Sequence, residues 1–191
     1  MVTVGIDEVG RGCWAGPLLA GAVMLPAEIL AADLPKELRD SKLLTKKQRD
    51  FAAGWVYANA LAVGLGWVWP AELDRAGLSQ AVKRAMERAL EGLRDPYDEI
   101  IVDGNINYFA HNPKARAVIK ADATVPSVSA ASIVAKVARD AFMANLPHRY
   151  AGYEFDRHVG YGTAAHIAAL QRLGVSDLHR QSFKPIRAFM A

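Results

Sequence analysis

Residues 2–12 have the sequence V-T-V-G-I-D-E-V-G-R-G. The apolar start of this stretch predicts a buried strand that ends in two carboxylates, Asp7 and Glu8, and a Gly-Arg-Gly turn follows. A carboxylate at the end of a buried strand is costly without a partner, so the pair indicates either a site or two solvated strand-end acids. Neighbours on a regular strand point to opposite faces, so both can reach one site only if the strand ends or bulges there, which Gly10 would allow.

Outward from this stretch, the chain alternates between strand and helix patterns. Helical spacing, a capping-box pattern at Thr45 to Gln48 and the positions of proline predict helices at about 45–60, 79–93, 126–144 and 162–173. Apolar runs predict strands at 2–7, 18–25, 61–69, 100–102 and 118–119, and the last two are short β-branched runs typical of strands buried on both faces. The pattern predicts an α/β fold with one mixed sheet flanked by helices.

Bulk composition narrows the class of protein. The 191 residues, 52% of them hydrophobic and 23% charged, suit one globular domain, 1–191. A net charge of +3 favours anionic partners only mildly. Cys13 is the single cysteine, so an intrachain disulfide is impossible and a cytoplasmic setting is expected, with Cys13 as a small buried residue. Residues 12–27 are too short and too rich in Gly and Pro to cross a membrane, and we expect neither a secretory signal nor a membrane partner.

Asp103 and Asp122 extend the acidic pattern. Each follows an apolar run, and ligands in open α/β sheets bind at the carboxyl ends of strands, so four carboxylates can converge with Asp7 and Glu8. Such a cluster would raise its own pKa values unless cations neutralise it, and all-oxygen ligands suit Mg²⁺ or Mn²⁺. Two such ions are the usual machinery of phosphodiester hydrolysis. The residues therefore predict a metal-dependent nuclease.

An ordered set of motifs resembles the ribonuclease HII family. The motifs are G-I-D-E-V-G-R-G, D-S-K-L, V-D-G-N, K-A-D-A, S-A-A-S-I-V-A-K-V-A-R-D, G-Y-G-T-A-A-H and H-R-Q-S-F-K-P, which run in family order from residue 5 to 185. The resemblance implies the ribonuclease H-like fold, a five-stranded mixed sheet with flanking helices, here followed by a C-terminal helical segment. It also implies an endonuclease that cuts the RNA strand of RNA/DNA hybrids and incises duplex DNA at embedded ribonucleotides, leaving 5'-phosphate and 3'-hydroxyl ends. We expect a monomer.

The same resemblance assigns roles residue by residue. Asp7, Glu8, Asp103 and Asp122 match the family's metal-binding acids. The turn of Gly10, Arg11 and Gly12 matches the one that contacts the ribose 2'-hydroxyl, the group that distinguishes RNA from DNA, and Tyr161 matches a tyrosine that packs on the sugar after the scissile bond.

Further matches concern a helix face and the C-terminal motif. Ser129, Ser132, Lys136 and Asp140 recur at helical spacing and form one polar stripe, which we expect to face phosphates, although a solvated helix face is the alternative. Asp140 either pairs with Lys136 or lies behind the metal site. Lys42 is expected to contact a phosphate. His179 and Arg180 match the C-terminal motif, where a structural tie of the tail and a substrate contact are equally open.

Two departures and two rival functions complete the comparison. Ala121 stands where many family members have glycine, and Val159 stands where they commonly have lysine, which puts substrate affinity in doubt more than chemistry. A hybrid-binding protein without activity would be expected to lack one of the acids. A nuclease acting on DNA alone would have no need for the Gly-Arg-Gly turn and Tyr161. The related ribonuclease HIII type usually has an extra N-terminal domain, for which the position of Asp7 leaves no room.

Overall fold

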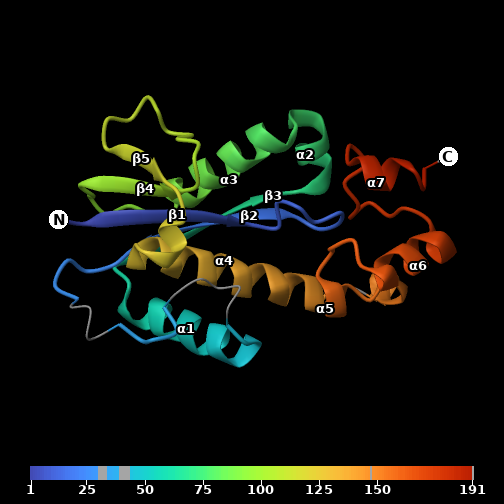
Figure 1. Ribbon diagram of the computed structural model, residues 1–191, viewed down its shortest axis with the longest axis horizontal. Coiled ribbons are helices and arrows are strands. Elements are labelled where there is room, and N and C mark those ends of the chain that lie inside the picture. The colour runs from blue at the N-terminus through green and yellow to red at the C-terminus, as the bar shows by residue number, and fades with distance from the viewer. Residues whose placement is uncertain (30–33, 39–43, 147, 191) are drawn as a thin grey trace.

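The computed structural model describes residues 1–29, 34–38, 44–146 and 148–190, and Lys42 lies outside them. Five strands form one sheet in the order β3-β2-β1-β4-β5 (Figure 1). Their bounds are Thr3–Val9 for β1, Leu18–Met24 for β2, Ala62–Val68 for β3, Glu99–Asp103 for β4 and Ala115–Val118 for β5.

The pairing of the strands places Asp7 and Asp103 at the same end of two neighbouring strands. β1 is antiparallel to β2 and parallel to β4, while β2 is antiparallel to β3 and β4 is parallel to β5. Ile6 pairs with Val102, so Asp7 and Asp103 follow from paired positions on neighbouring parallel strands. The mixed sheet predicted from the alternating pattern is confirmed.

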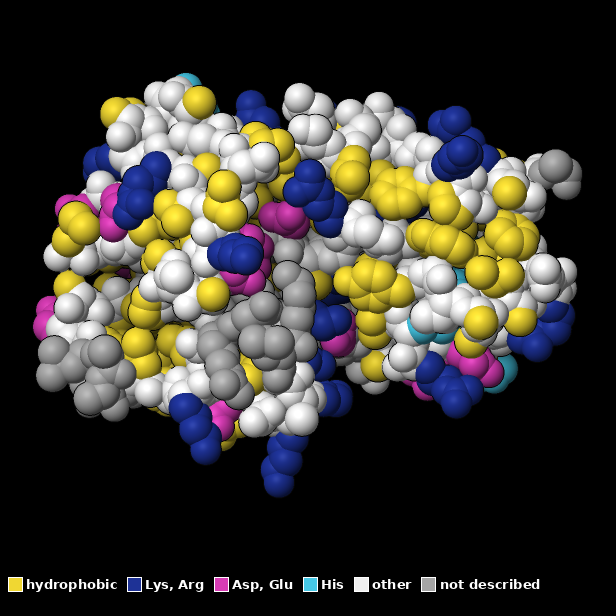
Figure 2. All heavy atoms as spheres, in the orientation of Figure 1, with side chains coloured by type: hydrophobic (Ala, Val, Ile, Leu, Met, Phe, Trp, Pro, Cys, Tyr) yellow, Lys and Arg dark blue, Asp and Glu magenta, His cyan; other side chains and the backbone are white. Residues whose placement is uncertain are grey.

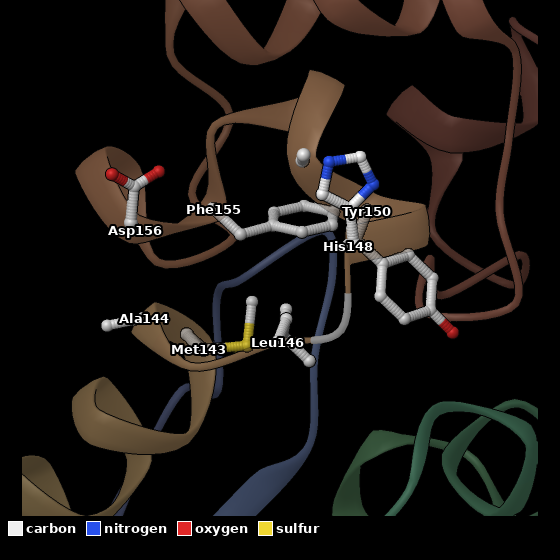
Figure 3. A pocket seen from close by; sticks show the side chains of 8 residues that line it. Met143, Ala144, Leu146, His148, Tyr150, Phe155 and Asp156 are labelled. Atoms are coloured by element: carbon white, nitrogen blue, oxygen red, sulfur yellow. The ribbon is translucent and has the colours of Figure 1, made fainter.

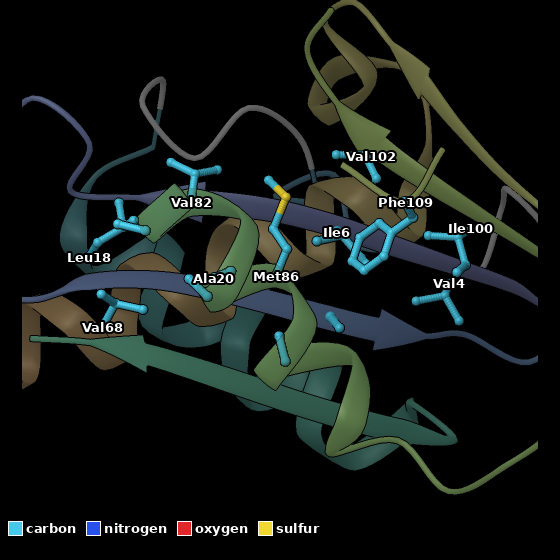
Figure 4. Packing of buried hydrophobic residues seen from close by; sticks show 14 of the residues in the cluster. Val4, Ile6, Leu18, Ala20, Val68, Val82, Met86, Ile100, Val102 and Phe109 are labelled. Atoms are coloured by element: carbon cyan, nitrogen blue, oxygen red, sulfur yellow. The ribbon is translucent and has the colours of Figure 1, made fainter. Parts of the chain in front are cut away.

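Helices cover both faces of the sheet. On one face lie α4, Pro126–Ala144, and beyond it α1, Lys46–Asn59; on the other lie α2, Pro70–Ala76, and α3, Leu78–Glu91 (Figure 1). The larger core forms between the sheet and α3, where Val4, Ile6 and Ile100 pack with Met86 (Figure 4). No helix in the described part of the chain has both the length and the apolar character that a membrane span requires.

The last quarter of the chain forms a group of short helices beside the end of α4 (Figure 1). It comprises η4, a 3-10 helix at His148–Tyr153, then α5, Phe155–His158, α6, Ala164–Leu173, and α7, Lys184–Arg187. This is the expected C-terminal helical segment. Helix α6 begins after Thr163, whose hydroxyl accepts from the backbone N–H of His166, so it starts two residues later than the spacing predicts.

Most predicted elements are present, and one prediction about burial is wrong. The capping box at Thr45 and Gln48 is formed and starts α1. The run at 118–119 does not form a strand buried on both faces, because β5 is the edge strand, Arg116 on it is exposed, and Ile119 lies beyond its end and is 71% exposed. Sequence reasoning also missed the short helices α2, α5 and α7.

Glycines set how closely α4 approaches the sheet. A Cβ atom on Gly5 would lie 2.1 Å from the backbone carbon of Ser127, and one on Gly21 would lie 2.5 Å from the carbonyl oxygen of Ala131. The first turns of α4 therefore rest directly on the backbone of β1 and β2. This contact places α4 beneath Asp7, two residues after Gly5 on the same face of the strand.

We predict that Gly5→Ala destabilises the protein by about 3 kcal/mol or more, because α4 must move away from β1 to admit a methyl group. Gly54→Ala is the matched control: Gly54 is exposed on α1, a Cβ there meets nothing within 4 Å, and the change should stabilise by about 0.5–1 kcal/mol. Urea denaturation measures both. Equal effects of the two substitutions would contradict the close packing.

Candidate active site

Three acids converge at the carboxyl edge of the sheet. Asp7 at the end of β1, Asp103 at the end of β4 and Asp122 each offer one carboxylate oxygen, and these oxygens lie within 4.8 Å of one another. Asp7 and Asp122 are buried, and Asp103 is partly buried. Figure 2 shows acidic side chains near the middle of one face of the molecule, bordered by Lys and Arg side chains.

Asp103 organises the loop that carries Asp122. Its Oδ1 accepts from the backbone N–H of Ala121 at 2.8 Å and more weakly from that of Asp122 at 3.4 Å. Asp122 lies in η3, a 3-10 turn at Ala121–Ala123 that follows Lys120, which adopts the left-handed region. Ala121 is fully buried in a small apolar cluster with Ile101 and Val128, so its methyl group is accommodated at this position.

Asp7 lies in a poorly solvated position. Burial, followed by the charges of Glu8 and Asp103, raises the pKa of Asp7 to about 8, although a hydrogen bond from Ser132 and one from the backbone N–H of Glu8 oppose the shift. Ionised Asp7 is therefore disfavoured in the protein alone, and a neighbouring cation would relieve this.

Glu8 is held apart from the other three acids. β1 continues in regular pairing through Val9, with no bulge at Asp7 and Glu8, so their side chains leave opposite faces of the strand. Glu8 pairs with Arg11 at 3.3 Å. Burial raises the pKa of Glu8, Arg11 opposes that shift, and the charge of Asp103 adds to it. The acidic cluster therefore still acts electrostatically on Glu8.

The Gly-Arg-Gly turn is bonded to the loop that carries Tyr161. Gly10 has a φ of 82°, and a Cβ on Gly12 would meet nothing within 4 Å, so the backbone there is open to a ligand. Just after the turn, the N–H groups of Trp14 and Ala15 both donate to the carbonyl of Gly160, at 2.8 and 3.2 Å. Two segments about 150 residues apart in sequence thus form one unit.

The residues of the expected polar stripe on α4 occupy two different environments. Ser129 and Ser132 are buried against the sheet, which sets them apart from a stripe that faces substrate. Lys136 and Asp140 are partly exposed and pair at 2.9 Å. The ring of Tyr161 is 42% exposed, and its centroid lies 5.9 Å from the Nζ of Lys136.

Two fully buried arginines, Arg139 on α4 and Arg180 in the C-terminal segment, brace this region. Their guanidinium groups donate to backbone carbonyls at 2.8–3.1 Å: Arg139 to Ala15, Pro17 and Val159, and Arg180 to Arg11 and Gly16. For Arg180 this favours a structural tie. Sequence reasoning missed Arg139, although its place seven residues after the buried Ser132, on the same helix face, was a signal.

His179 is buried like Arg180, and the tail that follows is fixed to α2. The carboxylate of Asp74 accepts from the backbone N–H groups of Gln181 and Ser182, at 2.8 and 3.0 Å, and from the Ser182 hydroxyl. Cys13, expected as a small buried residue, is fully buried.

Val159, which stands just before Gly160 and Tyr161, has an unusual backbone conformation. It is a β-branched residue with a φ of 43°, in the left-handed region that such residues rarely adopt, and Gly160 follows with a φ of 87°. The Val159 carbonyl accepts from Arg139. The loop that presents Tyr161 is therefore strained and held in place by its surroundings.

A cavity of about 500 Å³ lies away from the acids, between the end of α4 and the η4 to α5 region (Figure 3). Its walls include Met143, Leu146, Tyr150 and Phe155, and it contains none of the residues singled out from the sequence as functional. Its lining offers no cluster of acids, so we place the chemistry at the sheet edge.

The strand order and the acids at the ends of β1 and β4 define a protein of the ribonuclease H-like fold. Ribonuclease H2 from Pyrococcus horikoshii superimposes on this chain with a TM-score of 0.80 at 24% identity, covering 99% of this chain and 97% of that one. A Bst-RNase HIII solved in complex with Mn²⁺ gives a TM-score of 0.69 at 18% identity, over all of this chain and 69% of that one.

Sequence comparison narrows the class to one family. The model of the family described as ribonuclease HII matches residues 4–186. Ribonuclease HII of Nitratidesulfovibrio vulgaris is 44% identical over 196 residues, which span 97% of this chain and 87% of that protein. The chain belongs to the ribonuclease HII family. It is a ribonuclease H, an endoribonuclease that acts on RNA/DNA hybrids.

We predict that Asp7→Asn stabilises the protein at pH 8.5 in the presence of a chelator, raising the melting temperature by several degrees. Burial raises the pKa of Asp7 from its ordinary value of 3.8 to about 8 in the folded protein. Between these two pH values the unfolded chain has released a proton that the folded protein keeps, so stability falls as pH rises toward 8, a loss that Asn avoids. At pH 5 Asp7 is protonated in the folded state and the difference should shrink. Differential scanning calorimetry at both pH values measures this, and a variant less stable than the parent at pH 8.5 would contradict the buried charge.

Proposed function

We propose that this enzyme cuts the RNA strand of hybrids and also incises duplex DNA at embedded ribonucleotides, leaving 5'-phosphate and 3'-hydroxyl ends. The convergence of Asp7, Asp103 and Asp122 carries the proposal, and Glu8 is a fourth acid whose charge acts on Asp7. Removal of ribonucleotides from replicated DNA would be the corresponding role in the cell.

The acids fit a divalent cation, Mg²⁺ or Mn²⁺. The donors are all carboxylate oxygens, which these hard ions prefer, and the raised pKa of Asp7, due first to burial, marks a position where positive charge is needed. The Bst-RNase HIII complex with Mn²⁺ has the same fold. Two bound cations would activate water and stabilise the leaving oxygen.

Hydrogen bonds within the protein would hold the carboxylates of the acidic cluster in position. Ser132 donates to Asp7 from α4, and Asp103 holds the turn of Asp122 through backbone N–H groups. These contacts fix the carboxylates before a ligand arrives, which reduces the reorganisation needed during the reaction. Asp140, paired with Lys136, would act through Lys136 rather than as a ligand.

Recognition of the sugar would fall to the turn and to Tyr161. The backbone of Gly10 to Gly12 can offer amides and carbonyls to a 2'-hydroxyl, and a site built to hydrogen-bond a group rejects substrates that lack it. The exposed ring of Tyr161 would pack on the next sugar, and Arg11 and Lys136 would face phosphates. DNA without ribonucleotides should therefore remain uncut.

We predict that Asp103→Asn and Asp122→Asn each reduce cleavage by about a hundredfold or more, the scale of losing one preorganised electrostatic contact in an active site. Asp140→Asn, at a partly exposed acid on α4 outside the acidic cluster, is the control, and it should cost far less. Single-turnover rates on a hybrid, with binding measured separately, test the ranking. Cleavage that persists with a chelator, or a larger loss for Asp140→Asn, would refute the assignment.

We predict that Tyr161→Ala reduces cutting at a lone ribonucleotide in duplex DNA by about tenfold more than cutting within a long hybrid, because the ring packs on the deoxyribose after the ribonucleotide. Tyr57→Ala removes another exposed tyrosine, on α1, and should leave the ratio of the two rates unchanged. Both rates are measured on one preparation, with thermal melting as the folding control. Equal losses on the two substrates would exclude Tyr161 from junction recognition.

A further inference from the structure

Three histidines are packed together behind the loop that carries Tyr161. His166 is 0% exposed and His179 is 1% exposed. The ring of His158 stacks on that of His166, with the ring centroids 4.5 Å apart. Nothing in the proposed chemistry uses these imidazoles, so their arrangement requires a separate account.

The hydrogen bonds of this cluster determine which nitrogen of each ring carries the proton. The Nδ1 of His179 accepts from the backbone N–H of Ser176 at 2.9 Å, so its proton is on Nε2. The Nε2 atoms of His179 and His166 are 3.0 Å apart, so His179 donates and His166 accepts. The proton of His166 is then on Nδ1, which faces the carbonyl of Tyr161 at 2.9 Å.

His158 completes the support from the other side of the same peptide segment. Its Nδ1 accepts from the backbone N–H of Gly160 at 3.3 Å, and its Nε2 donates to the carbonyl of Tyr153 at 2.8 Å. Histidines therefore hold both the N–H of Gly160 and the carbonyl of Tyr161. The N–H of Thr163 also donates to that carbonyl, at 2.9 Å, and closes the loop from the other end.

The imidazoles must be neutral to make this chain of hydrogen bonds. Burial lowers the pKa values of His166 and His179 to about 4. A second proton on the pair would set two N–H donors against each other at 3.0 Å. The arrangement is thus a directed chain from Ser176 through His179 and His166 to the backbone of Tyr161.

We propose that His166 and His179 are positioning residues that hold the backbone of Tyr161 and thereby set its ring against the sugar of the substrate. The inference rests on the role proposed above for Tyr161. The loop needs such support because the β-branched Val159 has a φ of 43°, and strained backbone of this kind persists only where its surroundings hold it. His179 acts by fixing the tautomer of His166, and His166 acts on the Tyr161 carbonyl.

Amide substitutions separate this role from a merely structural one. Asn places its amide near the Nδ1 position of histidine, where its NH₂ can donate to the Tyr161 carbonyl, and Gln places its amide near Nε2, where its oxygen can accept from His179 or its NH₂ can donate to His166. His166→Asn therefore keeps the bond to Tyr161 and loses the bond to His179, whereas His166→Gln does the reverse. Each variant loses one buried hydrogen bond, so both should melt at similarly lowered temperatures.

The readout is the ratio of kcat/KM on a lone ribonucleotide to kcat/KM on a long hybrid. We expect His166→Gln to lower this ratio by about fivefold, the scale of one neutral hydrogen bond, and His166→Asn to change it much less. His179→Asn should lower the ratio more than His179→Gln, which retains a donor for His166. His111→Asn, at an exposed histidine, is the control for general effects.

Three results would overturn the inference. If Tyr161→Ala lowers the ratio but the Asn and Gln variants of His166 have equal ratios, the histidines only support the fold. If Tyr161→Ala leaves the ratio unchanged, the role proposed for Tyr161 fails and this inference fails with it. Nitrogen-15 NMR of the unsubstituted protein gives a test free of variants: His166 should carry its proton on Nδ1 and His179 on Nε2, and the opposite tautomers would exclude the chain.

Discussion

The constraint on which the rest of this structure depends is a cluster of like charges held together in a poorly solvated site. Asp7, Asp103 and Asp122 are brought within 4.8 Å at the end of a buried sheet, and burial raises the pKa of Asp7 to about 8. Such a cluster is unfavourable for folding, so the rest of the domain has to enforce it. The pairing of β1 with β4 sets the first two acids side by side, and the backbone N–H groups bound by Asp103 bring in the third. This is the trade of stability for function that active sites commonly show.

A second constraint governs the Gly-Arg-Gly turn and the loop that carries Tyr161. Carbonyl groups of these two segments accept hydrogen bonds from buried side chains: Val159 from Arg139, Arg11 from Arg180 and Tyr161 from His166. Burying a guanidinium costs free energy, and multiple hydrogen bonds to carbonyls offset part of that cost. The benefit is rigidity, because Arg139 joins the helix that supports Asp7 to both loops. The acidic cluster, the Gly-Arg-Gly turn and the Tyr161 loop are therefore parts of one hydrogen-bonded structure, although their residues are spread along the chain from Asp7 to Tyr161.

The comparison of Asp7 with Glu8 shows how strand geometry divides adjacent acids between roles. Because β1 stays regular to Val9, Asp7 faces α4 and the other acids, while Glu8 leaves the opposite face and pairs with Arg11. Glu8 thus links the acidic cluster to the turn proposed to contact the 2'-hydroxyl.

The sequence by itself determined the α/β class, the caps and spans of the main helices, and the acids at strand ends. These features depend on local periodicity and on residue types whose burial costs free energy unless they have a partner. The ordered motifs determined the family. Only the tertiary structure decided that β5 is an edge strand, that Ser129 and Ser132 are buried, and that Arg139 and the histidines brace the Tyr161 loop. The physical reason is that each of these features depends on contacts between segments far apart in the chain. Local sequence pattern says which residues a helix or strand carries, but only packing decides what each side chain meets.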